Sequence, residues 1–238
     1  MILFPNAKLN IGLFVTGKRP DGFHDLETVF YPLELCDILE VLPLVGSTEQ
    51  GKCCFEGSGI DLGCAPEKNL VMKAYRLLDK EFGLPSVTVH LHKVVPFGAG
   101  LGGGSSDAAF MLRGLNELFR LGLTEEELTD RASELGSDCA FFIGNRPAFA
   151  SGRGERLEKI GLSMSGYWIV LVKPDFGIST AEAYAGICPV EAACDLRRLE
   201  ELPLEQWKGV VANDFEKSLF PKYPRLAELK QYLYDKGA

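Results

Sequence analysis

The sequence predicts an α+β fold, in which strands come first and a mixture of helices and strands follows. Alternating apolar and polar residues mark the first third of the chain, whereas apolar residues at helical spacing appear only after residue 66. Of the 238 residues, 46% are hydrophobic and 24% are charged, which is typical of a globular protein. Because strands and helices do not alternate regularly, the pattern favours α+β over a doubly wound parallel sheet.

Strands are expected in the N-terminal third. In residues 8–16 the odd-numbered apolar residues take one face of a strand, and Lys8 and Asn10 share the other face about 7 Å apart. The composition of residues 17–22, Gly-Lys-Arg-Pro-Asp-Gly, predicts a turn after this strand. Two further strand-like segments follow, at 26–35 and 38–42.

Helical patterns begin at residue 66. A first helix is expected over 66–83, and a second begins near Ser105. Thr124 and Glu127 form a capping box for a third helix that ends at Gly136. The inward face of the first helix is expected to hold Leu70, Val71, Ala74, Leu78 and Phe82. The other expected elements are a strand at 86–92, a buried strand at 167–172, a helix capped by Ser179-x-x-Glu182, and a helix at 224–237 with Leu226, Leu229 and Leu233 inward.

Charge and hydropathy exclude several classes of protein. The formal net charge of −8 argues against a nucleic-acid partner, because nucleic-acid affinity depends on a basic face. The longest apolar run, 167–172, is far shorter than the ~20 residues of a membrane span. No signal peptide is apparent at the N-terminus. We therefore expect a cytoplasmic protein, monomeric or weakly dimeric, that acts on a small molecule and has no membrane partner.

The cysteines and histidines do not predict a metal site. The seven cysteines are an odd number and include the adjacent pair Cys53-Cys54, so we expect reduced thiols. His90 and His92 form an H-x-H within an alternating strand, which is typical of a polar strand face rather than of a metal site. The remaining cysteines, whose separations fit no zinc spacing, are Cys36, Cys64, Cys139, Cys188 and Cys194.

The strongest chemical signal is the glycine-rich stretch 96–109. Five glycines within residues 98–104 precede two hydroxyls and a helix, and such density is unfavourable unless the backbone must approach a ligand closely. Free backbone amides at a helix N-terminus form an anion site, so this stretch predicts phosphate binding. A Walker A loop is excluded because no Lys follows the glycines. Two alternatives stay open: a dinucleotide fingerprint, since Gly98, Gly100 and Gly103 match G-x-G-x-x-G, and a purely flexible loop.

The stretch 96–109 resembles the ATP-binding motif of the GHMP kinase superfamily, and its triple glycine resembles the branch that acts on a cytidine diphosphate methylerythritol. Three other blocks are similar to that branch and follow in family order. They are 7–13 with 19–24, Gly136–Phe142 and Asn213–Glu216.

The resemblance implies a two-part fold. It consists of an N-terminal ribosomal-protein-S5-like nucleotide-binding domain over 1–150 and a C-terminal ferredoxin-like domain over 151–238. The chain stops at Ala238, where the family carries a third glycine-rich segment, so we interpret the C-terminal domain as incomplete.

The implied activity is Mg²⁺-dependent transfer of phosphate from ATP to the 2-hydroxyl of cytidine diphosphate methylerythritol, in non-mevalonate isoprenoid biosynthesis. By similarity, Lys8 and Asp138 form the catalytic pair. The implied ATP site comprises Asn69, Lys93, Pro96, Gly98, Gly100, Leu101, Gly102, Gly103, Gly104, Ser105 and Ser106. The implied substrate residues are Asn10 and Thr180 at the methylerythritol phosphate, and Phe23, His24 and Tyr184 at the cytosine.

Part of this chemistry is reasonable from the residues themselves. Asp138 is a plausible proton acceptor, and Lys8 suits charge stabilisation, although alone they would be interpreted as a turn residue and a solvated lysine. Phe23 and His24 offer a stacking face and a hydrogen bond to a pyrimidine, or else anchor the turn. The alternative functions are a mevalonate- or homoserine-type kinase and a non-catalytic nucleotide-binding module.

Overall fold

The computed structural model describes residues 1–44, 52–61, 63 and 65–238. The described chain forms two compact units. Unit 1 contains residues 1–9 and 30–148, and unit 2 contains residues 10–29 and 149–238. Each unit is discontinuous in sequence, because strands β2 (Asn6–Lys18) and β3 (His24–Cys36) each contribute to both. The expected division into functional domains at residues 150/151 stays a prediction.

Unit 1 contains a four-stranded sheet in the order β1-β4-β6-β5. Its strands are β1 (Ile2–Leu3), β4 (Ile38–Pro43), β5 (Cys53–Gly59) and β6 (Val87–Lys93). Strand β6 pairs antiparallel with β4 and parallel with β5. The odd-numbered residues of β6 are buried and the even-numbered ones, including His90 and His92, are half-buried on the other face. The predicted alternation of this strand is therefore confirmed.

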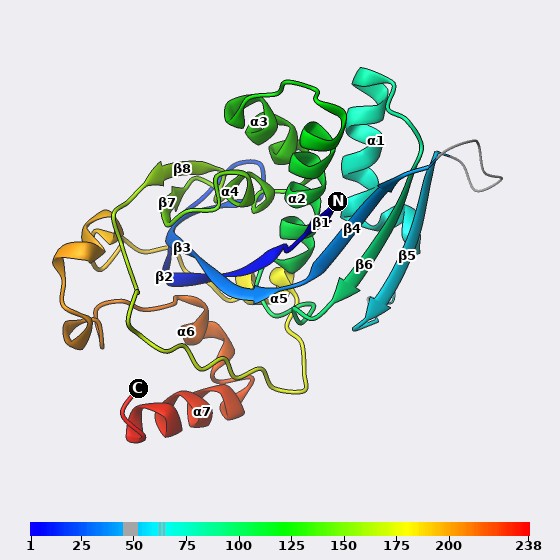
Figure 1. Cartoon of the computed structure of the whole chain (residues 1–238). Helices are drawn as coiled ribbons and strands as arrows, with labels where there is room; N and C mark the ends of the chain where they lie inside the picture. The colour runs from blue at the N-terminus through cyan, green and yellow to red at the C-terminus, as the bar shows by residue number, and fades with distance from the viewer. Residues whose placement is uncertain (45–51, 62, 64) are drawn as a thin grey trace. The chain divides into compact units, whose positions relative to one another are not determined.

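Helices lie on one side of this sheet, where the first two contact its strands and the next two pack on those helices (Figure 1). They are α1 (Leu70–Phe82), after a short 3₁₀ turn at Pro66–Lys68, α2 (Gly103–Phe119), α3 (Glu125–Leu135) and α4 (Cys139–Gly144). Helix α1 begins later than expected because the Asn69 side chain accepts the Val71 N–H and caps it. The expectation that Phe82 points inward is wrong: this last residue of the helix is 38% exposed, and Met72 and Tyr75 are buried instead.

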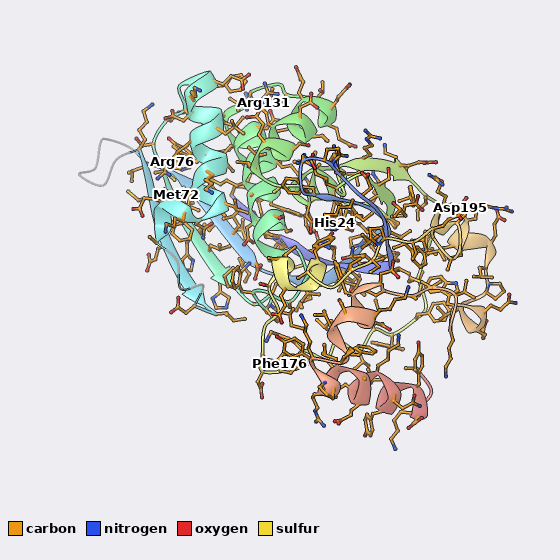
Figure 2. All side chains as sticks on the ribbon, turned by 180° about the vertical axis from the view of Figure 1, so that it is seen from behind. His24, Met72, Arg76, Arg131, Phe176 and Asp195 are labelled. Carbon is orange, nitrogen blue, oxygen red and sulfur yellow. The ribbon has the colours of Figure 1, made fainter. Side chains whose placement is uncertain are left out.

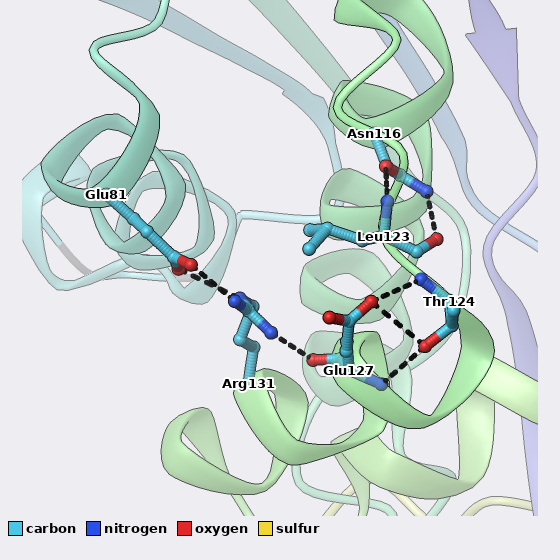
Figure 3. Close-up of polar contacts among 6 residues, drawn as sticks. All are labelled: Glu81, Asn116, Leu123, Thr124, Glu127 and Arg131. Atoms are coloured by element: carbon cyan, nitrogen blue, oxygen red, sulfur yellow. Dashed lines mark hydrogen bonds and ion pairs between the residues drawn. The ribbon is translucent and has the colours of Figure 1, made fainter.

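The predicted capping box at the start of α3 is confirmed (Figure 3). Thr124 N donates to Glu127 Oε2 at 2.8 Å, and Glu127 N donates to Thr124 Oγ1 at 3.2 Å. The Arg131 guanidinium pairs with Glu81 and so joins α3 to α1, while Asn116 exchanges two hydrogen bonds with the Leu123 backbone. These contacts hold the helical layer behind the glycine-rich loop.

The second sheet has the order β2-β3-β7-β8, where β7 is Ala148–Ser151 and β8 is Arg156–Lys159. In unit 2 it is accompanied by short helices and turns: α5 (Thr180–Tyr184), 3₁₀ turns at Leu196–Glu201 and Leu204–Gln206, α6 (Phe215–Leu219) and α7 (Pro224–Asp235). The buried carboxylate of Asp214 accepts the N–H of Val15 and so joins α6 to β2. The predicted caps at Ser179 and helix at 224–237 are confirmed.

The expected buried strand at 167–172 is wrong. All six residues are at least 40% exposed, and Trp168 is 97% exposed. No strand among the described residues pairs with this segment. An apolar run specifies a strand only where a neighbour supplies the backbone hydrogen bonds, and none is present here. The expected inward leucines of α7 are only half-buried, lining a shallow cavity with Val172 and Pro174.

Among the described residues, no helix combines the length and the apolar character needed to cross a membrane.

Candidate active site

The glycine-rich loop leads directly into the N-terminus of α2. The helix begins at Gly103, two residues before the expected start, so the last glycines of the motif form its first turn. Gly102 has φ +71°, and a Cβ placed on it would lie 2.9 Å from the Phe142 ring and 3.1 Å from Lys8 Cγ. Only glycine fits this position, and its small size keeps backbone amides available at the positive end of the helix.

A cavity of about 390 Å³ lies over this loop. The structure brings to its lining all of the expected ATP-site residues except one. These are Asn69, Lys93, Pro96, Gly98, Gly100, Leu101, Gly102, Gly103, Gly104 and Ser105. The exception is Ser106, which is fully buried and whose Oγ has no hydrogen-bond partner among the described residues. A cavity lined by a glycine-rich loop at the N-terminus of a helix fits a phosphate chain.

Lys8 and Asp138 form an ion pair, with Lys8 Nζ 3.3 Å from Asp138 Oδ2. The Lys8 side chain is 5% exposed and that of Asp138 is 31% exposed, so the lysine is enclosed while the carboxylate remains accessible. The Lys8 N–H also donates to Leu101 O at 2.9 Å, which ties β2 to the glycine-rich loop. A solvated strand lysine, the alternative interpretation, does not describe this residue.

The position of Asp138 follows from its helix. Asp138 precedes α4 but makes no side-chain capping bond, so its carboxylate is not committed to the helix terminus. The next residue, Cys139, is buried, and its thiol interacts with the Ser105 side chain in the first turn of α2. Burial raises the pKa of Cys139 to about 11. This neutral thiol is therefore a packing group beneath the pair rather than a nucleophile.

Lys93 lies at the end of β6 and is 4% exposed. Its ammonium contacts two buried carboxylates, Asp37 and Asp107. Neither acid has a local pattern that distinguishes it in the sequence. Because Lys93 and Asp107 line the cavity, this charged cluster belongs to the surroundings of the glycine-rich loop.

A second group of expected residues lies within unit 2. The His24 and Tyr184 rings stack with centroids 4.9 Å apart and an interplanar angle of 18°; His24 is labelled in Figure 2. Phe215 contacts Tyr184 edge-on at 4.9 Å. Phe23 is 55% exposed, and the Arg153 guanidinium lies 5.1 Å from the centroid of its ring. The structure thus brings three rings together and places an arginine on the fourth.

The two residues expected at the methylerythritol phosphate are also in unit 2. Asn10 Nδ2 donates to Thr28 Oγ1 at 3.0 Å. Thr180 is the exposed first residue of α5, directly after the Ser179 cap. The expected site residues are therefore divided between the units, with the loop, Lys8 and Asp138 in unit 1 and the cytosine and phosphate residues in unit 2.

Sequence reasoning did not single out Phe215 or Arg153. Phe215 lies within the block Asn213–Glu216 that resembles the family, so the sequence pointed to this segment. It did not indicate the contact between the Phe215 and Tyr184 rings. The described residues contain no group of three His, Cys, Asp or Glu side chains able to bind a metal by themselves. Cys64, one of the cysteines weighed for zinc, lies outside the described residues.

Comparisons with known proteins identify relatives along the whole chain. A model of the GHMP kinases N terminal domain matches residues 69–153. A 4-diphosphocytidyl-2-C-methyl-D-erythritol kinase from Bacteroides fragilis is 52% identical over 238 residues, which cover 100% of this chain and 86% of the relative. An enzyme of the same name from Bacteroides thetaiotaomicron is 50% identical with the same coverage.

A solved structure agrees with these sequence matches. A crystal structure of 4-(cytidine 5'-diphospho)-2C-methyl-D-erythritol kinase is similar to this chain with a TM-score of 0.71 and 33% identity, covering 100% of this chain and 84% of that one. The predicted GHMP-kinase-like α+β fold is confirmed by these matches.

Proposed function

Because this chain belongs to the 4-diphosphocytidyl-2-C-methyl-D-erythritol kinase family and is thus a small-molecule kinase, we propose that it transfers the γ-phosphoryl group of ATP to the 2-hydroxyl of 4-diphosphocytidyl-2-C-methyl-D-erythritol. The reaction would serve non-mevalonate isoprenoid biosynthesis in the cytoplasm. The observation that carries the proposal is the Lys8–Asp138 ion pair, because the stem of Lys8 packs against Gly102, the residue that precedes α2 and lines the cavity over the glycine-rich loop.

The proposed nucleotide site uses the backbone more than side chains. Amides of residues 98–104 and the N-terminus of α2 bind the phosphate chain, and Asn69 and Lys93 line the rest of the cavity. ATP, when bound, supplies the phosphoryl group, and Mg²⁺ neutralises charge on its oxygens. Mg²⁺ usually keeps several waters and is held largely by substrate phosphates, so the described residues are compatible with it although they contain no preformed cluster.

The proposed chemical step is a direct displacement at phosphorus. Asp138 accepts the proton of the 2-hydroxyl as the bond from that oxygen to the γ-phosphorus forms and the bond from the γ-phosphorus to the bridging oxygen breaks, leaving ADP. Lys8 stabilises the negative charge that develops on the attacking oxygen and keeps the Asp138 carboxylate oriented. The half-exposed position of Asp138 supports this role, because the substrate hydroxyl must reach it.

The cytosine is assigned to the aromatic residues of unit 2. A base inserted between two rings needs two van der Waals spacings, about 7 Å, whereas the His24 and Tyr184 centroids are 4.9 Å apart. The base therefore stacks on an outer face of this pair or separates the two rings on binding. Phe23, which is 55% exposed, offers a further aromatic face for stacking.

The test measures transfer of labelled γ-phosphate from ATP to a panel of acceptor alcohols. We expect turnover with 4-diphosphocytidyl-2-C-methyl-D-erythritol and none with mevalonate or homoserine, which have no base to stack. Preference for either of those would contradict the substrate assignment. Tight ATP binding without transfer to any acceptor would instead favour a non-catalytic nucleotide-binding module.

A further inference from the structure

A buried cluster of three charged residues forms part of the floor of the glycine-loop cavity. Lys93 Nζ donates to Asp37 Oδ2 and, at 2.6 Å, to Asp107 Oδ2. The three side chains are between 0% and 4% exposed. Lys93 and Asp107 both line the cavity, whereas Asp37 lies behind Lys93. The step proposed above does not use either acid.

The two carboxylates have unequal surroundings. Asp37 Oδ1 accepts the N–H groups of Val94 and Val95 at 2.6 and 2.9 Å, in addition to the Lys93 bond at Oδ2. Asp107 Oδ1 has no hydrogen-bond partner among the described residues. Backbone N–H bonds stabilise the ionised form of a carboxylate. Asp37 is therefore the acid that stays ionised, and Asp107 is the acid that takes up a proton.

The electrostatics agree with this geometry. Burial raises the pKa of Asp107 to about 7; Lys93 opposes the rise, and the negative charge of Asp37 adds to it. With both acids ionised the cluster carries one net negative charge, which is unfavourable in a buried site. With Asp107 protonated the cluster is neutral. The charge at the cavity floor therefore changes near neutral pH.

Few other charges face this cavity. Among the described residues that line it, the only other charged side chain is that of Lys68, from the turn before α1. The Lys8–Asp138 pair lies beside Gly102 on the other side of the loop. A polyphosphate in the cavity would thus meet cations from Lys68 and Lys93, and the charge of Asp107 would decide how far Lys93 is neutralised.

We propose that Asp107 is a positioning residue for nucleotide binding: with Asp37 it fixes the Lys93 ammonium at the cavity floor, and the charge on its own carboxyl sets the affinity of the cavity for a polyphosphate. Asp107 acts through Lys93 and takes no part in the transfer of the phosphoryl group. The inference rests on the proposed use of ATP.

The test compares ATP binding by the full chain and by Asp107→Asn, which keeps the shape of the side chain and removes its charge. Calorimetric titrations at about pH 6 and about pH 8.5 contain excess Mg²⁺. Any titration of the ligand is the same for both proteins, so the readout is the ratio of their dissociation constants. We expect a ratio near one at the lower pH and about tenfold tighter binding by the variant at the higher pH, because one buried negative charge has been removed. The KM for ATP should follow this ratio while kcat does not.

Asp79→Asn is the matched control, because Asp79 on α1 also pairs with a lysine, Lys52, but does not line the cavity. The dissociation constants for ATP of wild type and Asp79→Asn should be equal at both pH values. A second measurement needs no variant: titration of the wild-type chain in buffers of different ionisation enthalpy should show proton uptake on ATP binding near pH 7.5.

The outcomes separate this inference from the proposed function. Suppose that wild type binds and uses ATP. If the dissociation constants of wild type and Asp107→Asn are then equal at both pH values, or if wild type takes up no proton, the role proposed for Asp107 is wrong and the kinase proposal stands. If wild type binds no ATP, both proposals fail.

Discussion

Lys8 Nζ lies 3.3 Å from Asp138 Oδ2 and 4.5 Å from the centroid of the Phe30 ring. The ammonium is thus held between a carboxylate and an aromatic face, in a side chain that is only 5% exposed. A lysine fixed in this way loses little conformational freedom when it meets a reacting group. The relationship joins a residue near the N-terminus to one 130 positions later, and the first prediction depends on it.

Replacing Asp138 should abolish turnover and spare nucleotide binding. Asp138→Asn keeps the size of the side chain but cannot accept the hydroxyl proton, so we expect kcat to fall by about 10²–10⁴-fold. The dissociation constant for ATP should change little, because Asp138 does not line the cavity. Steady-state kinetics and calorimetry measure the two quantities separately.

Asp130→Asn, a substitution of an acid on α3 outside the site, is the control and should retain wild-type kcat. Near-normal turnover of Asp138→Asn would remove the carboxylate as the proton acceptor. It would leave Lys8 and the loop as the residues that support catalysis.

Gly102 should tolerate no side chain. Gly102→Ala places a Cβ 2.9 Å from the Phe142 ring and at a positive φ, so the loop or the ring must move. We expect weaker ATP binding by at least tenfold and a lower melting temperature. Gly122→Ala is the matched control, because Gly122 has φ +77° but nothing within 4 Å of its Cβ position.

Both alanine substitutions carry the backbone strain of a left-handed residue, about 1 kcal/mol. The additional effect of Gly102→Ala therefore measures crowding against Phe142 and Lys8. Equal melting temperatures and equal ATP affinities for the two variants would show that the close approach at Gly102 has no role in the site.

Removing the His24 ring should weaken binding of the cytidine substrate before it affects ATP. Loss of a base-stacking ring is worth about 1–3 kcal/mol, so His24→Ala should raise KM for the substrate by roughly 5- to 150-fold. The KM for ATP should stay within about twofold of wild type, because the residues that line the cavity all belong to unit 1.

Phe176→Ala is the control for this substitution, because the Phe176 and Tyr223 rings stack at 5.2 Å with an interplanar angle of 13° in the same unit. Both residues, His24 and Phe176, are labelled in Figure 2. An equal rise in substrate KM for both variants would indicate general loosening of unit 2 rather than loss of a base contact.

Local sequence predicted the elements whose determinants are local. The Thr124–Glu127 box and the glycines of the loop each act within a few residues, through hydrogen bonds or backbone conformation, so the pattern was sufficient. Helix α4 was not predicted, because its six residues, Cys139–Gly144, are apolar on all sides and offer no helical period. The strand at residues 167–172 was predicted from apolar composition alone, and composition does not show whether a neighbouring strand is present to pair with it.

In the site, too, local sequence was not sufficient where a residue's role depends on distant residues. Lys8 and Asp138 were named through resemblance, since each by itself has an ordinary interpretation. Asp107 lies within the matched motif but looks like one polar residue early in a helix. Its burial beside Lys93 and Asp37 depends on residues 14 and 56 to 70 positions away, which no local pattern contains. The cluster of Lys93, Asp37 and Asp107 was the part of the site that required the structure.

The buried Asp107 should also make the protein less stable as the pH rises. Burial raises its pKa in the folded state from 3.8 to about 7. The unfolded chain therefore releases this proton at lower pH than the folded chain. The contribution of Asp107 to the free energy of unfolding is complete below about pH 4 and is lost as the pH rises toward 7. The loss amounts to at most about 1.4 kcal/mol per pH unit. Urea unfolding of wild type and Asp107→Asn between pH 5 and 8 measures it. The stability of wild type should fall relative to the variant across this range.

The pH window matters, because other acids act in the opposite direction. Hydrogen bonds from Thr124 lower the pKa of Glu127, and Arg131 lowers the pKa of Glu81. The contribution of these two carboxylates to the stability of the folded chain is therefore lost only as the pH falls below the ordinary pKa of a glutamate. Above pH 5 both are ionised in the folded and the unfolded chain, and Asp107 acts without their interference. Parallel stability curves for wild type and Asp107→Asn from pH 5 to 8 would mean that the Lys93 ammonium holds Asp107 ionised throughout, despite burial and the negative charge of Asp37.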